Sequence, residues 1–283
     1  MASPDSCIFT LVTGTGYTGR RVLERLPAES VTGLSRSTLD TDRPLEIFDL
    51  DSATALPIEL PPMYAVIYTV PPKGDPPDGR LRLFLSMLTP APARFIYIST
   101  TGVYGDCSGK TVTEETPTNP SSDRAERRVA AEALLAEWTD ENDCDLVILR
   151  APGIYGPGRL GIERIRAQMP VLSEDSANPG NRIHVDDLAS CCVAALAPGA
   201  PACIYNVGDN DHRSSTWFTG EVARQLGLPA PPEISRERAE QEFSPQRLSF
   251  LTESRRVDTS KMREVLGVIP RYANPEDGIR ASM

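Results

Sequence analysis

The sequence VTGTGYTG, residues 12–19, joins a short apolar run to a segment with helical spacing. Its glycines follow the pattern G-x-G-x-x-G, which between a strand and a helix is typical of a loop that binds the diphosphate of a dinucleotide. Gly14 allows a tight turn, Gly16 leaves room for a phosphate beside the backbone, and Gly19 lets the helix pack on its strand. The loop predicts a bound dinucleotide, and a glycine-rich turn without a ligand is the alternative.

Apolar runs and helical segments alternate outward from this loop, and the runs are rich in β-branched residues. This order is typical of a parallel sheet with helices on both faces, so the expected fold class is α/β with a doubly wound parallel sheet. Asp123 and Asp186 are expected to cap the helices that begin beside them. The expected strands are 8–13, 30–34, 64–70, 94–99, 145–149 and 203–207, and the expected helices are 17–26, 80–88, 123–138, 186–197, 215–226 and 259–266.

The composition limits the classes of partner. A chain of 283 residues with 40% hydrophobic residues can fill a full core, and its net charge of −10 argues against nucleic acid and anionic membrane surfaces. The sequence has no apolar run long enough to span a bilayer and no secretion signal at its start. Six cysteines without C-x-x-C spacing indicate buried thiols in a reducing compartment. We therefore expect a cytoplasmic protein without a metal site, since only two histidines are present.

The end of the second expected strand reads Gly33-Leu34-Ser35-Arg36 and contains no carboxylate. An acid usually bonds the ribose hydroxyls of NAD near this point, and it would repel a 2′-phosphate. Arg36 can instead bind that phosphate through two hydrogen bonds, and Ser35 can add a hydroxyl. We therefore expect NADP(H) as the preferred cofactor and NAD(H) as a possible one, while the competing interpretation makes Arg36 a solvated loop residue. The expected cofactor-binding residues are Gly14, Thr15, Gly16, Tyr17, Thr18, Gly19, Ser35, Arg36, Asp49, Leu50 and Thr69.

Several segments occur together and in a specific order: VTGTGYTG, DLD at 49–51, ISTTGVYG at 98–105, LRAPGIYGPGR at 149–159, RIHVDDLA at 182–189, YNVGD at 205–209 and the tail VDTSKMREVLGVIP. In this order they resemble the extended short-chain dehydrogenase/reductase (SDR) superfamily, which contains sugar-nucleotide epimerases and dehydratases. The resemblance implies a Rossmann-type domain at residues 5–155 and 184–207. It also implies a smaller C-terminal substrate lobe at residues 156–183 and 208–283.

Catalysis in that superfamily rests on a Ser/Thr before V-Y-G and on a Tyr-x-x-x-Lys at the start of the next long helix. Thr100 matches the Ser/Thr position, and counting back from Glu132 places Arg128 at the lysine position and Arg124 at the tyrosine position. Arg128 can still donate to ribose hydroxyls. Arg124 cannot replace the tyrosine, because a guanidinium stays protonated and has no accepting lone pair. Arg124 either binds a carboxylate or phosphate of a ligand or pairs with an acid of its own helix.

The glycine motif here is one residue shorter than the G-x-x-G-x-x-G that is usual in the extended SDR family. This shorter spacing and the two arginines are similar to those of atypical SDR subgroups. Tyr155 in the GIYGPG loop and Tyr104 are further candidates for proton transfer, so the expected catalytic set is Thr100, Arg128, Arg124 and Tyr155. His184 is expected to be structural unless a cleft exposes it.

Two functions of different classes remain open at this stage. The first is an NADP(H)-binding oxidoreductase or epimerase-like enzyme that acts on a small polar metabolite. The second is a non-catalytic NADP(H) sensor that binds a protein partner, and a cofactor-independent lyase or isomerase is a third option. The expected partner is a small-molecule substrate or effector, with a homodimer as a possibility because the helix 123–138 has apolar residues on more than one face.

Overall fold

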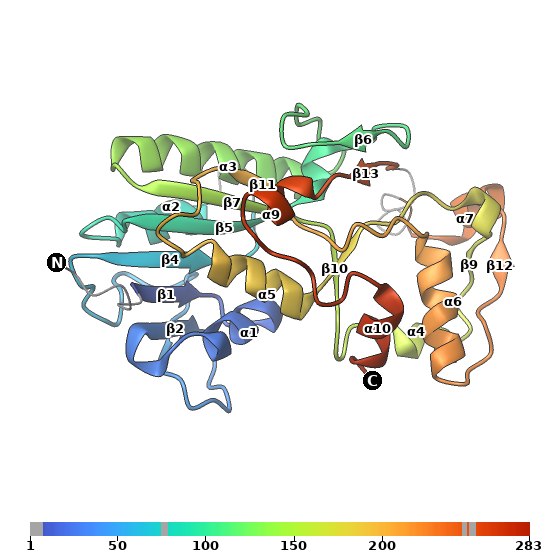
Figure 1. Ribbon diagram of the computed structural model, residues 1–283, viewed down its shortest axis with the longest axis horizontal. Helices are drawn as coiled ribbons and strands as arrows, with labels where there is room; N and C mark the ends of the chain where they lie inside the picture. The colour runs from blue at the N-terminus through green and yellow to red at the C-terminus, as the bar shows by residue number, and fades with distance from the viewer. Residues whose placement is uncertain (1–7, 75–78, 245–247, 249–252) are drawn as a thin grey trace.

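The structure is a computed structural model that describes residues 8–74, 79–244, 248 and 253–283. A seven-stranded parallel sheet forms its centre, with the strands in the order β11-β7-β5-β4-β1-β2-β3 (Figure 1). This confirms the α/β fold with a Rossmann-like parallel sheet. The strands are β1 (Phe9–Thr13), β2 (Val31–Ser35), β3 (Leu45–Ile47), β4 (Tyr64–Tyr68), β5 (Arg94–Thr100), β7 (Asp145–Ala151) and β11 (Ile204–Asn206).

Helices cover both faces of the sheet, because its strands are apolar on both sides. On one face α1 (Tyr17–Arg25), α5 (Val185–Ala194) and α9 (Ser260–Glu264) bury apolar side chains in one cluster with the sheet. On the other face α2 (Gly79–Ser86) and α3 (Asp123–Glu141) form a second cluster that includes Phe84 and Leu135. Figure 1 shows α3 on one side of the sheet and α1 and α5 on the other.

Smaller elements gather beyond the carboxyl ends of the strands (Figure 1). Three two-stranded parallel pairs, β10 with β8, β12 with β9 and β13 with β6, connect them. The strands are β6 (Thr111–Val112), β8 (Gly153–Tyr155), β9 (Val171–Leu172), β10 (Arg182–His184), β12 (Glu233–Ile234) and β13 (Arg256–Val257), and the helices are α4 (Ile162–Arg166), α6 (Ser215–Gln225), α7 (Arg236–Glu242) and α10 (Pro275–Arg280). Three 3-10 turns complete the described elements, at Ala28–Ser30, Thr101–Tyr104 and Glu174–Ser176.

Two capping predictions are wrong. Asp123 is the first residue of α3, and the cap position belongs to Ser122, whose side chain makes no capping hydrogen bond. His184 caps α5, because its Nδ1 accepts the backbone N–H of Asp186. The Asp186 carboxylate instead pairs with Arg25 of α1 at 3.1 Å.

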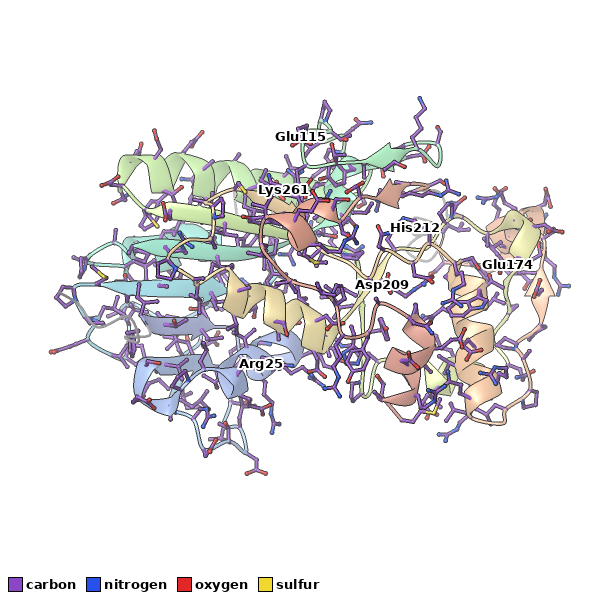
Figure 2. All side chains as sticks on the ribbon, viewed as in Figure 1. Arg25, Glu115, Glu174, Asp209, His212 and Lys261 are labelled. Carbon is purple, nitrogen blue, oxygen red and sulfur yellow. The ribbon has the colours of Figure 1, made fainter. Side chains whose placement is uncertain are left out.

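Arg182 and Asp209 join the sheet to the smaller elements. The Asp209 N–H donates to the carbonyl of Arg182 over 3.0 Å, and the Arg182 guanidinium pairs with Asp211 at 2.8 Å. Asp209 lies at the centre of the molecule, whereas Glu174 lies at its far end (Figure 2). Burial raises the pKa of Asp209 to about 7, because no counter-ion fully offsets the loss of water.

A buried ion pair fixes α3 against the sheet. Glu132 of α3 accepts hydrogen bonds from Arg150 of β7 at 3.2 and 2.7 Å, and both side chains are less than a tenth exposed. Ser99 donates to the same carboxylate, and Arg150 donates to the hydroxyl of Tyr104 over 3.0 Å. Tyr104 in turn donates to Asn206 of β11 over 2.7 Å. The network therefore holds the middle of α3 beside the ends of three neighbouring strands.

Replacing Glu132 alone by alanine leaves the Arg150 charge buried without its partner. We expect this variant to lose about 3–5 kcal/mol of unfolding free energy. The double variant Glu132→Leu/Arg150→Met removes both charges and is expected to lose less than the single one. Urea unfolding of the three proteins measures the difference. A loss below about 1 kcal/mol in Glu132→Ala would show that the pair does not hold α3 in place.

Candidate functional site

A large cleft lies at the carboxyl ends of the sheet strands, where parallel α/β folds bind their ligands. Its volume is about 1110 Å³, above the usual range of a pocket for one small molecule. Its wall brings together most residues singled out from the sequence, namely Gly14, Thr15, Gly16, Tyr17, Thr18, Ser35, Arg36, Asp49, Leu50, Thr69, Thr100, Arg124 and Arg128. Gly19 lies beneath the loop, and Tyr155 lies outside the cleft.

The glycine loop needs its three glycines for three different reasons. Gly14 has a φ of +89°, which L side chains rarely adopt. A Cβ on Gly19 would overlap the carbonyl oxygen of Gly14. A Cβ on Gly16 would have no described atom within 4 Å, because this position faces the open cleft at the cap of α1. The loop is thus shaped so that a ligand can approach its backbone next to the amino end of α1.

The glycine loop and the hydroxyl groups beside it together form a cradle for a ligand. The Thr69 hydroxyl donates to the carbonyl of Gly14 and so ties the end of β4 to the loop. The hydroxyls of Thr13 and Thr15 are buried and have no hydrogen-bond partner among the described residues. Burying such groups without a partner costs free energy, so this wall of the cleft is suited to a polar ligand.

Cationic side chains surround the end of the cleft beyond β2. Arg36 is exposed at the end of that strand, and Lys73 and Arg80 reach the same wall from the loop after β4 and from α2. Asp51 pairs with Lys73 at 2.9 Å and with Arg80 at 3.2 Å. The hydrogen bond from Lys73 lowers the pKa of Asp51, so this carboxylate is ionised, and the two cations balance its negative charge. Ser35 donates its hydroxyl hydrogen to the carbonyl of Ser37 over 2.7 Å.

Tyr17 connects the glycine loop to the loop after β8. Arg159 lies over the Tyr17 ring with its guanidinium carbon 3.9 Å from the ring centre, and Arg21 lies 4.5 Å from it. A Cβ on Gly156 would lie 2.6 Å from the Tyr17 hydroxyl, so that glycine allows the two loops to approach. Arg159 is thereby held in the cleft wall beside the cradle.

Thr100 and Arg128 lie together at the opposite end. Thr100 ends β5, and its Oγ1 accepts the N–H of Gly102 over 3.2 Å. No acceptor for the Thr100 hydroxyl hydrogen is found in the described part of the chain, so this hydrogen can be donated into the cleft. One guanidinium nitrogen of Arg128 donates hydrogen bonds to the Tyr97 hydroxyl at 3.0 Å and to the Ile98 carbonyl at 2.5 Å. These bonds fix Arg128 against the strand that positions Thr100.

Arg124 lies one helical turn before Arg128 and also lines the cleft. Partial burial lowers the pKa of Arg124 and the charge of Arg128 adds to this effect, while the carboxylate of Glu253 opposes it. Glu253 accepts hydrogen bonds from Ser121 at 2.5 Å and from Arg255 at 2.6 Å. Residues 253 and 255 therefore bring one carboxylate and one more guanidinium to this end of the cleft.

The other candidates for proton transfer do not reach the cleft. Tyr155 is 4% exposed and packs against His184 and Phe218, with ring centres 5.2 and 5.1 Å away. Tyr104 is buried in the network with Arg150. Burial lowers the pKa of His184 to about 4, so this imidazole is neutral at pH 7. All eight tyrosines of the chain lie in the described ranges, and Tyr17 at the glycine loop is the one that lines the cleft.

Sequence reasoning missed several residues of the wall. Arg159 stands within the quoted LRAPGIYGPGR segment, and its place beside a glycine-rich loop was the available signal. Lys73, Arg80, Glu253 and Arg255 carried no such signal, because they come from a loop, a helix and a distant tail that only the folded chain brings together.

The described residues contain no group of three or more His, Cys, Asp or Glu side chains placed to hold a metal ion. Their helices include none that is long and apolar enough to cross a membrane.

Comparison with known proteins shows what this chain is similar to. The sequence model of the NAD dependent epimerase/dehydratase family matches residues 78–208. A UDP-glucose 4-epimerase of Mycolicibacterium smegmatis is 28% identical over 94% of this chain and 95% of its own length. These matches support an SDR-like member of the epimerase/dehydratase family. A solved protein of unknown function from Silicibacter pomeroyi has a TM-score of 0.77 and 29% identity, and the match covers 96% of this chain and 97% of that one.

The family match and the NAD complexes among similar solved structures support a nicotinamide cofactor. MoeE5 in complex with UDP-glucose and NAD matches with a TM-score of 0.74 and 19% identity over 96% of both chains, which shows a common fold. The cleft fits such a group, since Gly16 leaves its wall open and the Thr13 and Thr15 hydroxyls lack partners among the described residues. Gly14, Gly16 and the amino end of α1 are the groups that would hold its diphosphate.

Gly16 and Gly19 provide a matched test of the cradle. In Gly16→Ala the new methyl group enters open space at a φ of −74°, so we expect the unfolding free energy to change by less than about 1 kcal/mol. The methyl group would take up space that a diphosphate bound at this loop needs, so dinucleotide affinity should fall at least about tenfold. In Gly19→Ala the methyl group meets the Gly14 carbonyl, so stability itself should fall.

Thermal unfolding and fluorescence titration with NADPH measure the two effects. If Gly16→Ala bound NADPH as tightly as the unchanged protein, the glycine loop would not be the site that binds the diphosphate.

Proposed function

We propose that this chain binds NADP(H) in preference to NAD(H) and acts as an oxidoreductase or epimerase-like enzyme on a small polar metabolite. The observation that carries the cofactor preference is the set of cations beyond β2. Arg36, Lys73 and Arg80 lie there, and the charge of Asp51 is already taken up by two of them. A 2′-phosphate is a dianion near neutral pH, and a guanidinium binds it through charge-assisted hydrogen bonds.

Arg36 offers the sharpest test of this preference. We expect Arg36→Gln to weaken NADP⁺ binding about 10- to 100-fold, because one charge-assisted contact is lost, and to change NAD⁺ binding less than about threefold. Arg20→Gln is the matched control, since Arg20 lies outside the cleft wall and pairs with Glu24 on α1. Calorimetric titration with both dinucleotides measures the effect. Equal losses for NAD⁺ and NADP⁺, or an unchanged protein that prefers NAD⁺, would refute the proposal.

Thr100 and Arg128 support an enzymatic role. The Thr100 hydroxyl is oriented by Gly102 and can donate its hydrogen to an oxygen of the substrate. Arg128 is fixed by Tyr97 and Ile98, and its remaining N–H groups can bind ribose hydroxyls. A bound nicotinamide would supply the hydride donor or acceptor. The one tyrosine in the described cleft wall, Tyr17, lies at the glycine loop and not at the Thr100 end, so a non-tyrosine donor or water supplies the proton in this scheme.

A second candidate function is favoured by Arg124 at the position of the usual tyrosine. In this alternative the chain senses NADP(H) without turnover, and the C-terminal lobe binds a protein partner. Binding of the dinucleotide would then shift the lobe between two arrangements of different partner affinity.

Thr100 distinguishes the two functions. A screen of carbonyl and alcohol substrates, followed through the absorbance of NADPH, should find turnover that falls about 100-fold in Thr100→Ala. Thr100→Ser keeps the hydroxyl and should retain most of the rate. Tight NADPH binding without any turnover, combined with cofactor-dependent partner binding, would favour the sensor instead.

A further inference from the structure

The cleft differs in charge from the rest of the molecule. The whole chain has a net charge of −10. The described wall of the cleft nevertheless carries more cations than carboxylates. The cations are Arg36, Lys73, Arg80, Arg124, Arg128, Arg159 and Arg255, and the carboxylates are Asp49, Asp51 and Glu253. Positive charges that are gathered in a concave wall raise the local concentration of anions.

This excess is greater than the proposed cofactor requires. The cations beyond β2 lie with Asp49 and Asp51, and Arg159 lies beside the glycine loop over Tyr17. Arg124, Arg128 and Arg255 remain at the end that holds Thr100, where Glu253 is the one carboxylate of the described wall. Both oxygens of Glu253 already accept hydrogen bonds, from Ser121 and Arg255. The Thr100 end therefore keeps a positive charge after its own ion pair is counted.

Arg124 and Arg128 are held close together in spite of their like charges. They are one turn apart on α3, both line the cleft, and the charge of each acts against the other. Arg128 cannot easily move away, because it is bonded to Tyr97 and Ile98. An anion between the two guanidinium groups would relieve the repulsion. A neutral hydroxyl would not, since it brings no opposite charge.

We propose that the ligand of this cleft carries a carboxylate or phosphate group, which binds Arg124 and Arg128 beside Thr100. The inference rests on the proposed function for the place of the dinucleotide, and it adds the chemical class of the second ligand. A planar carboxylate or a phosphate can accept two parallel hydrogen bonds from one guanidinium. The anion would then fix the ligand so that a neighbouring oxygen meets the Thr100 hydroxyl.

The test measures anion binding to the full chain by calorimetry at constant ionic strength, with and without saturating NADP⁺. Inorganic phosphate and malonate are the probes, glucose is the neutral comparison, and UDP-glucose represents the ligand of the relatives. We expect one of the two small anions to bind, and its affinity to fall about 10- to 100-fold in Arg124→Gln. Arg124→Lys should restore part of it. Arg127→Gln is the matched control, since Arg127 stands on the same helix outside the cleft wall.

Phosphate and malonate separate the two sources of negative charge. Preference for phosphate indicates a phosphorylated ligand, and preference for malonate indicates a carboxylic acid. Absence of binding by both anions would overturn the inference, as would an equal loss in Arg127→Gln or binding of UDP-glucose that does not depend on Arg124. NADP⁺ binding is measured separately in the same titrations. Its absence would remove the proposed cofactor, while Arg124-dependent anion binding would still support this site.

Discussion

One carbonyl group, that of Gly14, ties the cleft to the sheet. It accepts the hydroxyl of Thr69 at the end of β4, and the backbone of α1 packs against it at Gly19 without an intervening Cβ. Because both contacts are close, they fix the positions of the loop, of α1 and of the strands β1 and β4 relative to one another. The amino end of α1 points into the cleft because of this arrangement, and the remaining walls are placed relative to it.

The framework of the cleft does not depend on the residues at the usual catalytic positions. α3 keeps its place through Glu132, which bonds Arg150 and Ser99 beneath the cleft. Arg124 and Arg128 stand nearer the start of the helix and line the cleft. The positions where the resemblance implies a tyrosine and a lysine can therefore hold two arginines without loss of the fold. A fold of this kind does not by itself fix the chemistry at this helix.

The sequence was a good guide wherever a signal is local. Buried strands such as β4, with five consecutive buried residues, were found to within two residues at each end, because apolar runs report burial directly. Helix caps were harder to predict. Asp123 and Asp186 are the first and second residues of their helices, and the cap positions belong to Ser122 and His184. Short pairs such as β13 with β6 join residues far apart in the sequence, so no local pattern predicts them. The same holds for Arg255 in the cleft wall.

The stacking of Arg159 on Tyr17 has a consequence for communication within the molecule. Tyr17 belongs to the first turn of α1, whereas Arg159 belongs to the loop that leads from β8 into α4. A diphosphate bound beside Tyr17 would attract the Arg159 guanidinium, so its binding would stabilise the position of the loop between β8 and α4. Thermodynamic linkage makes this influence mutual. A partner or ligand that favours the same position of the loop at Arg159 would therefore increase the affinity for the diphosphate by the same factor by which the diphosphate increases the affinity for that partner or ligand.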